Sequence, residues 1–279
     1  MSKVAAIQMV STGDVDENLA AASRLIGSAA EQGAELVLLP EVFAVLEGGP
    51  MRGYGEVEGS GKIQDFLAQQ ARDRQLILVG GTIPLLTRPR NSANERGEAI
   101  EDDRVRPACL VFDDCGVQIA RYDKMHLFDV RIDDRQARYS ESRSYEAGTD
   151  IVTLNTPLGH LGLSVCYDIR FPEFYRELFS RGVEIVTVPA AFTAVTGEAH
   201  WETLLRARAI ENQCYVIAAA QGGRHNEKRE TWGHSMVIDP WGSILSQIDK
   251  GEGIALAEID LDYLNKIRAK MPIAEQRKM

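Results

Sequence analysis

The sequence has few cysteines for its length, and none of them stands in a metal-binding or redox spacing. The four cysteines, at positions 109, 115, 166 and 214 of 279 residues, include no Cys-x-x-Cys pair, which argues against a zinc knuckle or a thioredoxin-like pair. So few cysteines in a chain this long do not indicate a disulfide framework. The five histidines include no His-Glu-x-x-His. We therefore expect no structural or catalytic metal.

An excess of basic residues is also missing. The 31 Lys and Arg residues are outnumbered by 41 Asp and Glu residues, which gives a net charge of -10. A phosphate backbone binds to a basic face, so we expect no nucleic-acid partner. No apolar run approaches the ~20 residues that span a membrane, and residues 1–8 lack the apolar stretch of a signal peptide. We expect no membrane partner and a cytoplasmic location.

The first third of the chain alternates between strand-like and helical patterns. Residues 4–9, 36–39 and 76–79 are short apolar runs of the kind that form buried strands. Between them, one helix is expected to begin at Asp14 or Asp16 and to end at Gly33, and a second is expected over residues 63–74. This βαβαβ order predicts an α/β sheet.

The rest of the chain continues this pattern without a break in composition. We expect polar loops over residues 85–106 and 131–148, and helices over residues 172–180 and 198–213. Further strands are expected at 108–112, 117–122, 161–165, 185–188 and 215–220, in a hairpin over 236–248, and at 254–259. With 44% hydrophobic residues and no internal repeat, residues 1–279 are predicted to form a single domain.

Three reactive side chains each follow one of the extended runs. Glu41 ends the motif Leu-Leu-Pro-Glu, Lys124 lies in Tyr-Asp-Lys-Met-His, and Cys166 lies in Val-Cys-Tyr-Asp-Ile-Arg-Phe-Pro-Glu. Ligand sites in open α/β sheets collect at the carboxyl ends of strands, so we expect these side chains to meet. A carboxylate, an ammonium and a thiol supply a base, an oxyanion donor and a nucleophile. The combination predicts amide hydrolysis.

Each of these residues also has a plain structural explanation. Cys166 can be a small buried hydrophobe, Glu41 can cap the segment that follows it, and Lys124 can be a solvated residue at a strand end. Only their co-occurrence favours catalysis. Because a helix is expected after Cys166, we expect its N-terminus to lower the pKa of the thiol.

These motifs resemble those of the nitrilase, or carbon–nitrogen hydrolase, superfamily over the whole chain. The resemblance implies that Glu41, Lys124 and Cys166 form the catalytic triad, and that Glu141, in Tyr-Ser-Glu-Ser, is a second active-site glutamate. It implies an αββα sandwich that assembles as a homodimer or a larger homo-oligomer. It also implies that no metal or organic cofactor takes part.

The residue types then suggest a mechanism. Glu41 would accept the thiol proton as Cys166 attacks the amide carbon, while Lys124 and the backbone N–H of Tyr167 face the oxyanion. Ammonia would leave a terminal amide, and water would hydrolyse the thioester that remains on Cys166. Glu141 would hold Lys124 or the substrate amide in place.

The substrate is suggested by segments 197–211 and 220–236, which resemble the Nit branch, and most closely its members that act on deaminated glutathione. A small acidic α-keto amide is therefore the expected substrate. Arg170, Arg224 and Lys228 are candidate anchors for its carboxylates, although each can equally be a surface charge or part of a structural ion pair. Loops 42–50 and 85–106 are candidate borders of the pocket. The alternatives are an ω-amidase acting on α-ketoglutaramate, an N-carbamoyl amino acid hydrolase, a nitrilase, and a non-catalytic scaffold.

Overall fold

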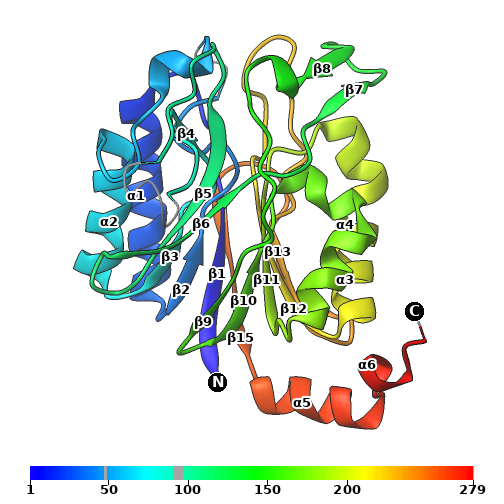
Figure 1. Ribbon diagram of the computed structural model, residues 1–279. Helices are drawn as coiled ribbons and strands as arrows, with labels where there is room; N and C mark the ends of the chain where they lie inside the picture. The colour runs from blue at the N-terminus through cyan, green and yellow to red at the C-terminus, as the bar shows by residue number, and fades with distance from the viewer. Residues whose placement is uncertain (47–48, 91–96, 279) are drawn as a thin grey trace.

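The protein consists of two β-sheets that pack face to face, with helices on both outer faces. The computed structural model describes residues 1–46, 49–90 and 97–278. In Figure 1, α1 (Val15–Glu31) and α2 (Lys62–Arg74) cover one sheet, and α3 (Pro172–Ser180) and α4 (Ala194–Asn212) cover the other. This arrangement confirms the expected αββα sandwich.

The seven-stranded sheet contains the N-terminal βαβαβ unit. Its order is β15-β1-β2-β3-β5-β4, and β6 pairs with β5. The pairs β1–β2 and β2–β3 are parallel, as the alternation of strands and helices predicts. The strands are β1 (Ser2–Gln8), β2 (Leu36–Leu38), β3 (Ile77–Val79), β4 (Ile83–Leu85), β5 (Arg106–Phe112), β6 (Gln118–Asp123) and β15 (Gly253–Ile259).

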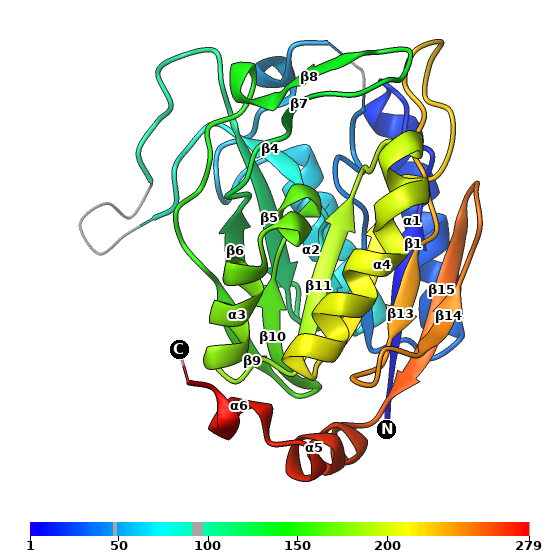
Figure 2. The same ribbon diagram turned by 90° about the vertical axis from the view of Figure 1, so that its right-hand side faces the viewer.

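The six-stranded sheet has the order β14-β13-β12-β11-β10-β9. Its central strands β10, β11 and β12 are parallel, and Figure 2 shows α3 and α4 running across the face of this sheet. The strands are β9 (Thr153–Thr156), β10 (Gly159–Leu163), β11 (Ile185–Ala190), β12 (Tyr215–Ala220), β13 (Met236–Ile238) and β14 (Ile244–Gln247). A separate antiparallel pair is formed by β7 (Asp129–Arg131) and β8 (Arg138–Ser140).

Strand β1 is buried on both faces, and its successive side chains enter two different cores. Val4 and Ala6 belong to the core shared with the six-stranded sheet, whereas Ala5 and Ile7 belong to the core beneath α1 and α2. Successive side chains of a strand point to opposite faces, so a strand that is covered on both sides is apolar throughout.

Several elements were not expected from the sequence. Strands β4, β7, β8 and β9 are short. The β7–β8 pair lies largely within the expected loop over residues 131–148, and it was not expected because its two strands lack an apolar pattern. Helices α5 (Leu261–Lys270) and α6 (Ile273–Gln276) follow the last strand. Within the expected loop over residues 85–106, positions 91–96 lie outside the described residues, as do 47–48 in the loop after Glu41. No helix in the described part of the chain combines the length and apolar character that a membrane crossing needs.

Candidate active site

Three strand ends bring Glu41, Lys124 and Cys166 together between the sheets. Glu41 follows β2 and Lys124 follows β6 of the seven-stranded sheet, whereas Cys166 follows β10 of the six-stranded sheet. The three residues are 4%, 1% and 6% exposed, respectively. Residues that lie far apart in the sequence therefore form one buried cluster, as the position of each at a strand end predicted.

The Lys124 ammonium lies between two carboxylates. Its Nζ donates hydrogen bonds to Glu41 Oε1 at 2.8 Å and to Glu141 Oε2 at 2.7 Å. Burial alone would lower the pKa of Lys124, but Glu141 and Glu41 outweigh it and hold this pKa well above the usual lysine value. Lys124 is therefore a cation at neutral pH. With both carboxylates ionised, the three groups together carry a charge of -1.

The Glu41 carboxylate is fixed from two sides. Oε1 accepts the Lys124 bond, and Oε2 accepts a hydrogen bond from the backbone N–H of Ala191 at 2.8 Å. The Cys166 thiol lies in the same recess as Glu41 and Ala191. A carboxylate has about four acceptor positions, which leaves Glu41 able to take up a proton from the adjacent thiol.

Cys166 has an unusual backbone conformation. Its φ of 48° lies in the left-handed region, which costs a non-glycine residue about 1–3 kcal/mol and is most often found at functional sites. Cys166 opens a short 3₁₀ turn, Cys166–Arg170, and α3 begins only at Pro172. Burial and the Glu41 carboxylate raise the pKa of the thiol well above its usual value, although Lys124 opposes them. The expectation that a helix N-terminus lowers this pKa is therefore wrong.

Glu141 lies at the start of the 3₁₀ turn Glu141–Arg143, next to the β7–β8 pair. Its Oε2 accepts hydrogen bonds from the Lys124 ammonium and, at 2.8 Å, from the backbone N–H of Phe128. The partly buried Tyr145 lies nearby, and burial together with Glu141 and Glu41 raises the pKa of its phenol. Tyr145 therefore keeps its proton and can donate a hydrogen bond into the site.

Asp168 is a buried carboxylate that the motif reading did not single out. It is fully buried, and its Oδ2 accepts hydrogen bonds from the Tyr122 hydroxyl at 2.6 Å and from the Val165 backbone N–H at 2.7 Å. It also contacts His126 Nδ1 at 2.7 Å and the His126 backbone N–H at 3.1 Å. Asp168 thus joins the turn that carries Cys166 to the segment that carries Lys124. The sequence signal that could have identified Asp168 is its position two residues after Cys166.

A cavity of about 360 Å³ opens above Glu41 and Glu141. It is bordered by residues of the 42–50 loop, as expected, but none of its described lining residues comes from 85–106. A smaller recess contains Cys166 and Tyr167, and it shares Glu41, Glu141, Ala191 and Arg229 with the cavity. The Cys166 thiol and the two carboxylates therefore border adjoining spaces.

The three expected carboxylate anchors do not line this space. Arg170 packs its guanidinium 5.1 Å from the centroid of the Phe192 ring and lies 3.3 Å from His200 Nδ1. Arg224 and Lys228 are exposed. The cation that lines both the cavity and the recess is Arg229. The basic segment 224–229 thus contributes Arg229 to this space, a residue that the sequence analysis did not name as an anchor.

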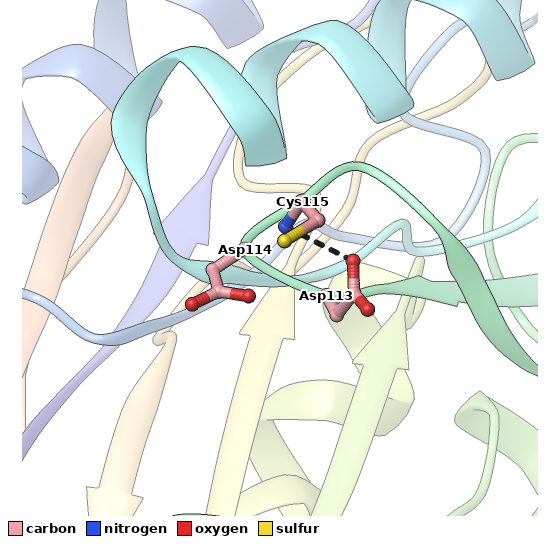
Figure 3. A group of neighbouring side chains, drawn as sticks. All are labelled: Asp113, Asp114 and Cys115. Carbon is pink, nitrogen blue, oxygen red and sulfur yellow. Dashed lines mark hydrogen bonds between the residues drawn. The ribbon is translucent and has the colours of Figure 1, made fainter.

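A second group of potentially reactive side chains lies at the β5–β6 turn. Figure 3 shows Asp113, Asp114 and Cys115, whose possible ligand atoms lie within 4.8 Å of one another. The Asp113 carboxylate accepts hydrogen bonds from the backbone N–H groups of Cys115 at 3.0 Å and Val117 at 2.8 Å. These bonds are those of an aspartate that closes a turn. The turn precedes β6, whereas Lys124 follows it, so this group belongs to the opposite end of the hairpin.

Comparison with known proteins places these features in a family. The family model described as "Carbon-nitrogen hydrolase" matches residues 3–269. The chain is 44% identical over 275 residues to the deaminated glutathione amidase of Synechocystis sp. (strain PCC 6803 / GT-S), covering 98% of this chain and 97% of that protein.

Solved structures agree with this assignment. Saccharomyces cerevisiae Nit3, described as a member of branch 10 of the nitrilase superfamily, matches with a TM-score of 0.86 at 31% identity, over 100% of this chain and 97% of that chain. An amidase from Nesterenkonia sp. AN1 matches with a TM-score of 0.77 at 26% identity, over 97% of this chain and 98% of that chain. That structure is a glutamate-to-glutamine mutant in which acrylamide has added to the active-site cysteine. The chain belongs to the carbon–nitrogen hydrolase family, and its enzymatic chemistry is the hydrolysis of amides.

Proposed function

We propose that this protein hydrolyses a small acidic α-keto amide, deaminated glutathione, through a thioester on Cys166. The observation that carries the proposal is the Lys124 ammonium, which is hydrogen-bonded to Glu41 and Glu141 beside a buried thiol. The name of the Synechocystis relative supports the choice of substrate. Residues 1–279 act as a single carbon–nitrogen hydrolase domain in this proposal.

Acylation begins from a neutral thiol, because the pKa of Cys166 is raised. As the Cys166 sulfur forms a bond to the amide carbon, its proton passes to Glu41, and the carbonyl electron pair moves onto oxygen. The C–N bond then breaks, and Glu41 returns the proton to the departing amine. A thioester remains on Cys166, and Glu41 is again a carboxylate.

Deacylation repeats these steps with water. Glu41 takes a proton from the water as its oxygen attacks the thioester carbon, and the C–S bond breaks with return of the proton to sulfur. The products are a carboxylic acid and the free Cys166 thiol. One carboxylate thus serves both half-reactions, because each needs a base first and an acid afterwards.

The oxyanion that forms in both steps is stabilised by the Lys124 ammonium and the backbone N–H of Tyr167. A preorganised donor of this kind contributes about 3–4 kcal/mol to the transition state. Glu141 holds Lys124 in place, since its Oε2 accepts one of the ammonium hydrogens at 2.7 Å. With Glu141 in this role, Glu41 can change its protonation state while Lys124 keeps one fixed partner.

The leaving group follows from the covalent structure of the substrate. Deaminated glutathione joins its keto acid to cysteinylglycine through a peptide bond, so hydrolysis releases that dipeptide. The ammonia expected from a terminal amide arises instead from α-ketoglutaramate. Both compounds give the same α-ketoglutaryl thioester and the same α-ketoglutarate product. They therefore share deacylation and differ in acylation.

The test measures three products separately, namely α-ketoglutarate, cysteinylglycine and ammonia. We expect deaminated glutathione to yield α-ketoglutarate and cysteinylglycine in equal amounts, with a higher kcat/KM than α-ketoglutaramate, because remote binding energy helps to orient the reacting amide. An equal or higher kcat/KM for α-ketoglutaramate would replace this substrate with that of an ω-amidase. Full activity of Cys166→Ala would refute the thioester mechanism. Turnover of only an N-carbamoyl amino acid or a nitrile would point to the other members of the superfamily.

We also propose that the protein is cytoplasmic and forms a homodimer or a larger homo-oligomer. Trp241 is 60% exposed, and it lines an apolar surface groove with Ile210 and Met271. Exposed apolar groups gathered in this way are typical of contact surfaces. Light scattering at micromolar concentration is expected to give at least the mass of a dimer, and a monomer at that concentration would contradict the proposal.

A further inference from the structure

An acidic substrate meets an unfavourable charge at the catalytic cluster itself. Glu41 and Glu141 share the single Lys124 ammonium, so the three groups sum to -1 when both carboxylates are ionised. Glu41 and Lys124 are almost fully buried, and electrostatic interactions are stronger where water is excluded. A substrate carboxylate bound beside these residues therefore needs a further cation.

Arg229 is the cation in the right place. Among the described residues that line the cavity above Glu41 and the recess beside Cys166, it alone carries a positive charge. Because it borders both spaces, it lies within reach of a group bonded to the Cys166 sulfur as well as of one held above Glu141. Arginine binds carboxylates through two parallel N–H bonds.

Two hairpins hold Arg229 in position. Its guanidinium carbon lies 5.7 Å from the centroid of the Tyr139 ring, and the Tyr139 hydroxyl donates to Asp134 Oδ2 at 2.7 Å. The backbone of Arg229 is set by a turn, because its N–H donates to Asn226 Oδ1 at 2.8 Å and its carbonyl accepts from the His225 N–H at 3.0 Å. The side chain is therefore aimed by contacts from segments ninety residues apart in the sequence.

We infer that Arg229 binds the α-keto carboxylate in the acyl half of the substrate and so determines the preference for acidic amides, an inference that rests on the proposed function. The acyl half stays attached to Cys166 through both steps, whereas the leaving half departs after the first. Since Arg229 borders the recess that holds the Cys166 sulfur, its partner is the carboxylate carried by the acyl group. Removing the arginine then weakens the hydrolysis of deaminated glutathione and of α-ketoglutaramate alike.

The test compares substrates with and without the carboxylate. The neutral probe is 4-oxopentanamide, which has a methyl group where α-ketoglutaramate has its carboxylate and which also releases ammonia. We expect the wild type to favour α-ketoglutaramate by about tenfold to a hundredfold in kcat/KM, the range of one charge-assisted contact. In Arg229→Gln this ratio is expected to fall to within about threefold, with the kcat/KM for 4-oxopentanamide retained. Arg229→Lys is expected to keep part of the preference, because an ammonium is a single point charge.

Arg138→Gln is the matched control. Arg138 is exposed, lies one residue from Tyr139 and does not line the cavity, so its loss should leave the substrate ratio unchanged. An unchanged ratio in Arg229→Gln would overturn the inference. An equal loss of kcat/KM on acidic and neutral amides would also overturn it, because that result indicates a structural role. A loss confined to deaminated glutathione would overturn it as well, because that result places Arg229 at the leaving half of the substrate. If the wild type hydrolyses no α-keto amide, the proposed function itself fails.

Discussion

Replacing Lys124 with methionine tests the electrostatics of the cluster directly. Methionine fills a similar volume but removes the charge and both hydrogen bonds, of 2.8 Å and 2.7 Å. Glu41 is then left 4% exposed, with the Ala191 N–H as its remaining hydrogen bond and Glu141 as a negative neighbour. The variant therefore buries two like charges that share no cation.

The expected loss follows from the burial of the partners. Removing one member of a buried ion pair costs about 3–5 kcal/mol of stability. Because Lys124 is the cation for two carboxylates, we expect the cost of Lys124→Met to lie toward the upper end of this range. The matched control is Lys62→Met. Lys62 pairs with Asp16 on the surface, and their side chains are 57% and 80% exposed. An exposed pair contributes about 0.2–1 kcal/mol, so this control should remain close to wild type.

The pH dependence has a definite sign. In Lys124→Met, the repulsion between the two carboxylates favours uptake of a proton by the folded state. The folded state then binds more protons than the unfolded state, so stability falls as the pH rises from about 5 to about 8, by at most ~1.4 kcal/mol per pH unit. In the wild type, the raised pKa of Lys124 makes stability depend on pH in the alkaline range instead. Its stabilising contribution is complete below the ordinary lysine value of ~10.4 and is lost as the pH rises through the higher folded value.

Equilibrium unfolding in urea at pH 5 and pH 8 measures both effects. We expect Lys124→Met to lose more free energy of unfolding at pH 8 than at pH 5, and the double variant Lys124→Met/Glu141→Gln to recover part of that loss, since one of the two like charges is gone. A loss below about 1 kcal/mol at pH 8, or one that does not change with pH, would refute this account of the cluster.

Two further variants test the roles of the neighbouring carboxylates. Glu41→Gln should lower the rate of acylation at least about a hundredfold and, because Glu41 raises the pKa of the thiol, should shift the pH midpoint for alkylation of Cys166 by iodoacetamide downward. Peptide mass mapping in a Cys115→Ser background measures this shift, since Cys115 is the exposed cysteine; an unchanged or higher midpoint would contradict the assignment. Asp168→Asn should lower kcat at least about tenfold, or ~1.4 kcal/mol, with a smaller change in KM, because an amide cannot accept all the hydrogen bonds of the carboxylate. A wild-type kcat would show that this network does not position the site.

The cluster of Glu41, Lys124 and Cys166 was accessible from the sequence because each of the three residues follows a strand. The apolar runs before Glu41 and Cys166 predict the strands, and the topology of an α/β sheet brings their carboxyl ends together. The direction of the pKa shift at Cys166 was not accessible in this way. It depends on how deeply the thiol is buried and on the Glu41 carboxylate beside it, and neither is a local property of the motif.

Arg229 and helix α5 were missed for different reasons. Arg229 is one of several cations in its segment, and the turn at Asn226 and the packing on Tyr139 distinguish it from its exposed neighbours. Those contacts join segments that lie far apart in the chain, so the local sequence does not indicate them. Helix α5, in contrast, carried a local signal, because Asp260 caps its first turn and Leu264 and Ile267 stand at helical spacing.

The central claim is that one thioester on Cys166 is common to both candidate substrates. The most direct measurement is the mass of the intact protein, quenched in acid within the first turnovers with deaminated glutathione and, separately, with α-ketoglutaramate. The account predicts the same mass increase from both substrates, equal to an α-ketoglutaryl group, mapped to Cys166 and absent in Cys166→Ala. Different increases from the two substrates, an adduct on another residue, or turnover in Cys166→Ala would contradict it.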